Sequence, residues 1–335
     1  MDTRERGIYN VSRAELPIIN EFASDVKEGL SCSRKNLQSK YFYDNVGSYL
    51  FEQICLQPEY YITRTEADIL REKSSDIAKI CPSDISIVEL GSGNSCKTRI
   101  LFEEILRKQD LLYYFPIDVS HSILTESVQK LSSDFPRLHP IGISSDYVNG
   151  IHKATEIIST QYHVPRRKLI LFLGSSIGNL EPRKVVSFLN MIRDRIEKED
   201  ILLVGFDLQK EHQILNAAYN DKAGMTEKCN LNLLTRINRE LGANFDIKKF
   251  SHHAFYNEEM GRVEMHLVSK ADQQIYIKEI EKSFEFKEGE SIHTENSYKY
   301  SLGQIQTLAE KSGFELNVNF LDKRNWFDLA LLSPF

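Results

Sequence analysis

The stretch Ile85-Ser86-Ile87-Val88-Glu89-Leu90-Gly91-Ser92-Gly93-Asn94 decides the fold, and a helical pattern and a second apolar run ending in Asp118 follow it. This order predicts a strand, a glycine turn, a helix and a second strand. Glycine allows the sharp turn into a helix and leaves room for a ligand against the main chain. An acidic residue that ends the next strand can accept hydrogen bonds from a ribose. The pattern therefore predicts a nucleoside site at Gly91 and Asp118.

The residues around the turn indicate which nucleoside it suits. Ser95 and Cys96 follow Asn94, so the third glycine of the dinucleotide fingerprint is missing. Glu89, just before the turn, would repel a pyrophosphate. A cationic nucleoside without phosphate fits better, and we expect S-adenosylmethionine (SAM) as the cofactor.

Composition narrows the class of protein. The 335 residues are 41% hydrophobic and 27% charged, which is typical of a globular protein with one large or two modest domains. A net charge of -6 argues against a nucleic-acid partner. The start of the sequence lacks the apolar core of a signal peptide, so we expect a cytoplasmic protein without a membrane partner. The five cysteines form no Cys-x-x-Cys pair and predict reduced thiols, and the histidines predict no metal site.

From Ile85 onward, apolar runs alternate with helical patterns. We predict strands at Ile85 to Leu90, Leu112 to Asp118, His139 to Ser144, Lys168 to Leu173 and Ile201 to Phe206. Helices are expected between them near Thr98 to Lys108, Ser122 to Leu131, His152 to Gln161 and Arg183 to Glu197. Such alternation predicts an α/β fold with a parallel, doubly wound sheet.

The alternation stops after Asp207. Helical stretches and then runs of alternating residues up to Phe286 predict an inserted α+β element. The chain ends in a helix and two extended segments, Phe314 to Leu321 and Trp326 to Leu332, which resemble the terminal antiparallel hairpin of class I methyltransferase folds. We therefore expect a Rossmann-like SAM-binding domain from 65–208 and 299–335. Residues 1–64 and 209–298 are expected to form a second, discontinuous α+β domain that binds the substrate.

Several motifs together resemble the histidine-specific N-α-methyltransferases of ergothioneine biosynthesis. The motifs are Tyr41-Phe42-Tyr43-Asp44-Asn45-Val46-Gly47-Ser48, Leu56-Gln57-Pro58-Glu59-Tyr60-Tyr61-Ile62-Thr63-Arg64-Thr65-Glu66, Glu89-Leu90-Gly91-Ser92-Gly93, Phe172-Leu173-Gly174-Ser175-Ser176-Ile177-Gly178-Asn179-Leu180 and Ala218-Tyr219-Asn220-Asp221. Shorter matches at Asn238-Arg239-Glu240-Leu241, Glu264-Met265 and Thr294-Glu295-Asn296-Ser297 extend the similarity over nearly the whole chain. The resemblance implies SAM-dependent trimethylation of the α-amino group of L-histidine to histidine betaine (hercynine).

The resemblance also implies the residues of both sites. The cofactor would be held by Gly91, Lys97, Asp118, Asp146 and Tyr147, with Lys97 on the carboxylate of the donor and the last two residues on the adenine. The implied catalytic residues, around the carboxylate and amino group of the substrate, are Tyr43, Asn179 and Tyr219. The other implied substrate-binding residues are Tyr60, Gly174, Met265, Glu295 and Ser297, of which Glu295 and Ser297 would face the side chain.

Two other functions are open at this stage. Relatives of this family methylate tryptophan-like amino acids, and Glu295 discriminates between the acceptors, because an indole offers one N–H donor and an imidazole has two nitrogens to bond. A nucleoside-binding regulator without catalysis is a third reading, which the substrate-side matches disfavour. We expect a monomer whose partner is a small-molecule substrate, the amino acid L-histidine.

Overall fold

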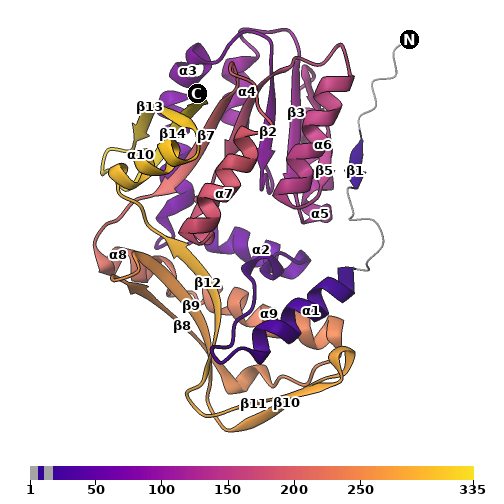
Figure 1. Ribbon diagram of the computed structural model, residues 1–335, viewed down its shortest axis with the longest axis vertical. Coiled ribbons are helices and arrows are strands. Elements are labelled where there is room, and N and C mark those ends of the chain that lie inside the picture. The colour runs from indigo at the N-terminus through magenta and orange to yellow at the C-terminus, as the bar shows by residue number, and fades with distance from the viewer. Residues whose placement is uncertain (1–6, 11–17) are drawn as a thin grey trace. The chain divides into compact units, whose positions relative to one another are not determined.

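The protein is described by a computed structural model over residues 7–10 and 18–335, and it divides into two compact units (Figure 1). Unit 1 comprises the described residues 7–10 together with Ile62–Gln209 and Lys299–Phe335. Unit 2 comprises the described residues 18–61 and Lys210–Tyr298. Both units are therefore built from segments that lie far apart in the sequence.

Unit 1 is organised around a nine-stranded sheet with the strand order β1-β5-β3-β2-β6-β7-β14-β13, and β4 pairs with β3 beside this path. All pairs from β1 to β7 are parallel, whereas β14 runs antiparallel to β7 and to β13. The strands are β1 (Ile8–Asn10), β2 (Ile85–Leu90), β3 (Leu112–Asp118), β4 (Leu138–Pro140), β5 (Gly142–Ser144), β6 (Arg167–Phe172), β7 (Ile201–Asp207), β13 (Phe314–Leu321) and β14 (Phe327–Pro334). This is the α/β fold with a terminal antiparallel hairpin that the sequence predicts.

The central strands are buried along their whole length, which explains their continuous apolar sequences. Every residue of β2 and of β7 is buried, as expected for parallel strands covered on both faces. The expected strand from His139 to Ser144 is instead two short strands. Pro140 has no amide hydrogen, so the ladder is interrupted there before it resumes at Gly142.

Strand β1 corrects the expected domain boundary. Residues 1–64 were expected to join 209–298, but Ile8–Asn10 pairs in parallel with Gly142–Ser144 at the edge of the sheet in unit 1. Three residues give too short a pattern to be recognised from the sequence, and their pairing depends on contacts with β5.

The helices of unit 1 lie along this sheet (Figure 1). They are α3 (Tyr61–Ile80), α4 (Arg99–Ile105), α5 (His121–Asp134), α6 (Tyr147–Thr160), the 3-10 turn η2 (Ser176–Asn179), α7 (Pro182–Arg193) and α10 (Leu302–Lys311). Helix α6 begins five residues before the expected His152, because the carboxylate of Asp146 caps it by accepting a hydrogen bond from the Asn149 amide at 3.0 Å.

A buried ion pair lies where the chain re-enters unit 1. Lys299 Nζ is 2.7 Å from Asp207 Oδ2, and both side chains are fully buried. Asp207 ends β7, and its amide donates to Ser175 Oγ at 3.0 Å. Removal of either charge would leave the other buried without its ionic partner, which is strongly destabilising.

Unit 2 has a three-stranded antiparallel sheet in the order β12-β9-β8 and a two-stranded sheet of β10 and β11. The elements are α1 (Ile18–Ser31), η1 (Ser39–Phe42), α2 (Asn45–Cys55), α8 (His212–Ala218), α9 (Met225–Leu241), η3 (Ile247–Lys249), β8 (Phe250–Asn257), β9 (Arg262–Ser269), β10 (Gln273–Ile277), η4 (Lys278–Ile280), β11 (Lys282–Phe286) and β12 (Ser291–Tyr298). Among the residues that the structure describes, no helix combines the length and apolar character needed to span a bilayer.

The side chain of Asp328 generates a prediction about stability. It lies fully buried on β14 between Phe206 and Leu321, and burial raises its pKa from the ordinary 3.8 to about 8. Because the pKa of Asp328 is higher in the folded chain than in the unfolded chain, Asp328 contributes its full stabilisation of the folded state below about pH 4. This stabilisation is lost as the pH rises to about 8. Asp328→Asn stays neutral and should escape this loss.

We therefore expect the unfolding free energy of Asp328→Asn, relative to wild type, to rise between about pH 4 and about pH 8 by up to about 1 kcal/mol per pH unit. Urea unfolding across this pH range measures the difference. Glu315→Gln, an exposed change on the adjacent β13, is the control and should show no such trend. A constant difference between Asp328→Asn and wild type would mean that Asp328 is ionised throughout this range.

Candidate active site

The glycine turn after β2 has the backbone conformation that requires glycine. Gly91 and Gly93 have φ of 72° and 50°, in the left-handed region that side chains disfavour. The amides of Gly91 and Ser92 donate to the Ile117 carbonyl at 2.8 and 3.1 Å, which holds the turn against the end of β3. A Cβ at Gly91 would lie 3.1 Å from Tyr147 Oη, so the main chain there packs closely against the phenol.

Asp118 links the glycine turn to the turn that follows its own strand. Its Oδ2 accepts from the Gly93 amide at 2.8 Å, and its Oδ1 accepts from the Ser120 amide at 2.9 Å. Burial raises the pKa of Asp118, and these backbone donors oppose that rise. The carboxylate is therefore held in place from both sides.

Glu89 lies in the interior of unit 1, which changes its predicted role. Burial raises its pKa to about 7, although Tyr114 and Thr98 both hydrogen-bond its carboxylate. Ser95, in the glycine turn, joins this network through Tyr114 at 2.8 Å. Glu89 thus connects β2, β3 and the start of α4. Since its carboxylate is buried and bonded within unit 1, its charge does not exclude a pyrophosphate from the glycine turn.

Asp146 and Tyr147 begin α6. Besides capping the helix, Asp146 accepts from the side-chain amide of Asn149 at 2.6 Å. The Tyr147 ring packs against Phe172 and Phe188 with centroid distances of 5.3 and 6.0 Å. Burial raises the pKa of Tyr147, so the phenol stays neutral.

Lys97 and Gly174 both contact Glu66, a residue that the sequence analysis did not assign to the site. Lys97 Nζ forms an ion pair with Glu66 Oε2, and the Gly174 amide donates to Glu66 Oε1 at 2.7 Å. Asn179 ends the short turn η2 that follows Gly174. Gly174 and Asn179 therefore belong to unit 1, together with all five predicted cofactor residues.

The remaining predicted substrate residues belong to unit 2, where three tyrosines gather. The rings of Tyr43, Phe51, Tyr60 and Tyr219 form a chain of edge contacts, with successive centroids 5.8, 6.2 and 6.2 Å apart. Burial raises the pKa of Tyr60, and the neighbouring Tyr219, Cys55, Tyr43 and Glu295 add to the rise. Tyr60 is therefore a neutral phenol at physiological pH.

Strand β12 carries Glu295 and Ser297, the residues predicted to face the side chain of the substrate, and it is joined to the tyrosine cluster. Its register with β9 shifts between His293 and Glu295, so that Glu295 lies opposite Met265. Ser297 lies two residues further along and on the same face. The hydroxyl of Tyr219 donates to Ser297 Oγ at 2.7 Å, which joins the tyrosine cluster to this strand.

His252 fixes the backbone at Tyr219. Its Nε2 is 2.9 Å from the Tyr219 carbonyl, and its Nδ1 is 2.9 Å from Asn230 Nδ2. The Asn230 amide is a donor, so Nδ1 accepts and Nε2 carries the proton. Burial lowers the pKa of His252, which keeps this neutral tautomer.

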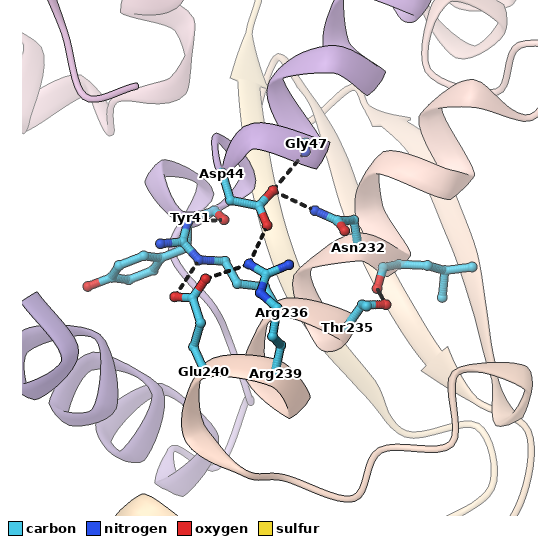
Figure 2. Close-up of polar contacts among 9 residues, drawn as sticks. Tyr41, Asp44, Gly47, Asn232, Thr235, Arg236, Arg239 and Glu240 are labelled. Atoms are coloured by element: carbon cyan, nitrogen blue, oxygen red, sulfur yellow. Dashed lines mark hydrogen bonds and ion pairs between the residues drawn. The ribbon is translucent and has the colours of Figure 1, made fainter. Parts of the chain in front are cut away.

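Asp44, the residue after Tyr43 in the sequence, is hydrogen-bonded to α2 and α9; Figure 2 shows the Asp44 contacts. It caps α2 by accepting from the Gly47 amide at 2.7 Å, and it accepts from Asn232 and Arg239 of α9 at 2.9 and 2.7 Å. Burial alone would raise the pKa of Asp44, but these donors, with Arg239 foremost, lower it below its ordinary value. The carboxylate is thus ionised at neutral pH.

A second contact holds the other side of Tyr43. Arg236 of α9 donates to the Tyr41 carbonyl at 2.9 Å, and its Nε lies 3.0 Å from Glu240 Oε2 (Figure 2). The backbone on both sides of Tyr43 is therefore attached to one helix.

Glu66, Asp44 and His252 support predicted site residues and were not predicted themselves. Glu66 and Asp44 occur in the quoted family motifs, and their place in those motifs was the available signal. No signal in the sequence indicated His252, because its role depends on a hydrogen bond with Asn230 and on another with the Tyr219 carbonyl. In the part of the chain that the structure describes, no three His, Cys, Asp or Glu side chains gather in a metal-binding arrangement.

The sequence of this chain matches a known family and named relatives. The sequence model of the family described as "Histidine-specific methyltransferase, SAM-dependent" matches residues 22–334. The histidine N-alpha-methyltransferase of Mycolicibacterium smegmatis is 37% identical over 307 residues, which cover 92% of this chain and 93% of the relative. The protein of the same name from Mycobacterium tuberculosis is 39% identical over 311 residues, with coverages of 92% and 94%.

A fungal relative matches over a smaller share of its own length. Ergothioneine biosynthesis protein 1 of Schizosaccharomyces pombe is 28% identical over 293 residues, which cover 85% of this chain and 37% of the relative. The family match, by contrast, includes both units almost completely. The chain thus belongs to the family of histidine-specific, SAM-dependent methyltransferases.

Proposed function

We propose that this protein transfers methyl groups from SAM to the α-amino nitrogen of L-histidine, and that it continues to histidine betaine, as in ergothioneine biosynthesis. The observation that carries the proposal is the cluster in which Glu295 and Ser297 share one face of β12 and Ser297 is hydrogen-bonded to Tyr219. The names of the two bacterial relatives support the same acceptor.

The donor site of unit 1 suits a nucleoside. The Asp118 carboxylate accepts from backbone amides on both oxygens, and a carboxylate has about four acceptor positions, so part of its capacity is available to ribose hydroxyls. Gly91 lets the main chain approach the Tyr147 phenol closely, the Tyr147 ring can line the adenine, and Asp146 can accept from the adenine amino group.

When bound, SAM supplies an electrophilic methyl group in line with the acceptor nitrogen. The task of the protein is then to hold an uncharged amine at that position and to exclude water. Burial disfavours the ammonium form of the substrate. The neutral phenol of Tyr60 can hydrogen-bond the substrate, and the faces of Tyr43 and Tyr60 can attract the methylated cation that forms.

The imidazole would be read by two groups of opposite character. Glu295 accepts from a ring N–H. Ser297, which accepts from Tyr219, lies on the same face and can bond the second ring nitrogen. This arrangement favours one orientation of the imidazole ring. An indole, with one N–H and no acceptor nitrogen, cannot satisfy both groups.

A turnover assay tests the function directly. Purified protein incubated with L-histidine and methyl-labelled SAM should produce mono-, di- and trimethylated histidine, which mass spectrometry resolves by successive increments of one labelled methyl group. Tryptophan and phenylalanine serve as competing acceptors in parallel reactions. Transfer to either of them in preference to histidine, or no transfer at all, would refute the proposal.

The role of Asp118 leads to a prediction for donor binding. Asp118→Asn keeps the size of the side chain but loses the charge and turns an N–H donor toward one of its backbone donors. We expect the Kd for SAM, measured by calorimetry, to rise roughly tenfold or more, since a hydrogen bond to a charged group contributes about 1.5–3 kcal/mol. Asp134→Asn, a surface change on α5, is the control. Wild-type affinity in Asp118→Asn would contradict the assignment.

Acceptor specificity gives a further prediction. Removing a buried hydrogen-bond partner costs about 1–3 kcal/mol, so Glu295→Ala should lower kcat/KM for histidine roughly tenfold. The activity toward phenylalanine or tryptophan should fall much less, because neither side chain satisfies the carboxylate as histidine does. Glu295→Gln, which keeps an acceptor oxygen, should lie between Glu295→Ala and wild type. If the ratio of kcat/KM for histidine to that for tryptophan is unchanged, Glu295 does not read the ring.

A further inference from the structure

Glu66 of α3 is a fully buried carboxylate whose two oxygens have separate partners. Oε1 accepts from the Gly174 amide at 2.7 Å, and Oε2 forms the ion pair with Lys97. A buried carboxylate is costly unless donors satisfy it, so these contacts are needed for its burial. The two partners come from different loops, one before α4 and one after β6.

The neighbouring strand leaves space for this carboxylate. Gly205 lies inside β7, although glycine weakens the interior of a strand and all other residues of β7 have side chains. A Cβ at this position would lie 2.3 Å from Glu66 Oε1 and 3.0 Å from the Phe327 ring. The absence of a side chain at Gly205 is therefore what allows Oε1 to reach the Gly174 amide.

The loop held by Oε1 has an unusual backbone. Gly174 and Ser175 have φ of 77° and 57°, so two successive residues are left-handed. A left-handed serine is strained and persists only where the surroundings fix it. The loop is fixed by Glu66 at Gly174 and by the hydrogen bond from the Asp207 amide to Ser175 Oγ at 3.0 Å.

We propose that Glu66 is a positioning residue for both ligands: Oε2 positions Lys97 for the carboxylate of the donor, and Oε1 positions the backbone of the loop at Gly174 for the amino-acid substrate. The proposal rests on the function proposed above. It requires the two oxygens to have separable effects, because each holds a different loop. If the ion pair between Glu66 and Lys97 were purely structural, its removal would lower stability without changing the binding of either ligand.

Two variants separate the oxygens. Glu66→Gln keeps an oxygen for the Gly174 amide but presents an amide N–H to Lys97, so the Kd for SAM should rise about tenfold while KM for histidine at saturating SAM changes less. Gly205→Ala displaces Oε1, so KM for histidine should rise about fivefold or more with a smaller change in the Kd for SAM. Calorimetry and steady-state kinetics give the two quantities.

The control is Glu72→Gln on the same helix, which removes an exposed carboxylate 2.8 Å from Lys323 and should change neither quantity. A lower thermal midpoint for Glu66→Gln with unchanged Kd for SAM and unchanged KM for histidine would overturn the proposal. The proposal would also fail if the ratio of the change in Kd to the change in KM were the same in Glu66→Gln and Gly205→Ala. If Glu66→Gln does not fold, Gly205→Ala still tests the Oε1 contact, because the proposal requires KM for histidine to rise more than the Kd for SAM in that variant. The calorimetric arm needs no turnover, so an unaltered Kd for SAM overturns the proposal even if histidine is not the acceptor.

Discussion

A carboxylate buried at the carboxyl end of a parallel strand must find hydrogen-bond donors, and unit 1 meets this requirement repeatedly. Glu89, Asp118 and Asp207 lie at or near the ends of three strands, and each is satisfied by a different neighbouring segment. These contacts attach the neighbouring segments to the sheet. The geometry of the proposed donor site depends on the hydrogen bonds that satisfy these buried carboxylates.

In unit 2, side chains of one helix hold neighbouring segments in a related way. Helix α9 supplies Arg236 and Arg239 to the chain around Tyr43, while Asn230 of the same helix orients His252, which in turn holds Tyr219. Two of the proposed substrate tyrosines therefore depend on one helix. No side chain of α9 is a proposed ligand contact. Under the proposed function, a change in the packing of α9 would nevertheless shift the two tyrosines and so alter substrate binding.

The sequence was informative wherever a signal was local. Long apolar runs predicted β2 and β3 with the bounds that the structure has, and Pro140 explains the one predicted strand that is divided. The partners of Glu66 could not be predicted, because its hydrogen bond to Gly174 joins residues 108 positions apart. Burial, which determines the protonation of Glu89, likewise depends on packing that no single segment encodes.

The register shift in β12 has a consequence for how acceptor preference is encoded. Side chains on a strand alternate between two faces, and one extra residue changes the parity of that alternation. Because Thr294 is accommodated as the extra residue, Glu295 shares a face with Ile292 despite lying three positions away. A straightened strand of the same composition would present Thr294 and Asn296 there instead. Under the proposed function, the preference for an amino acid therefore depends partly on this backbone irregularity. A change in the length of the strand would alter which side chains face the substrate without replacing any of them.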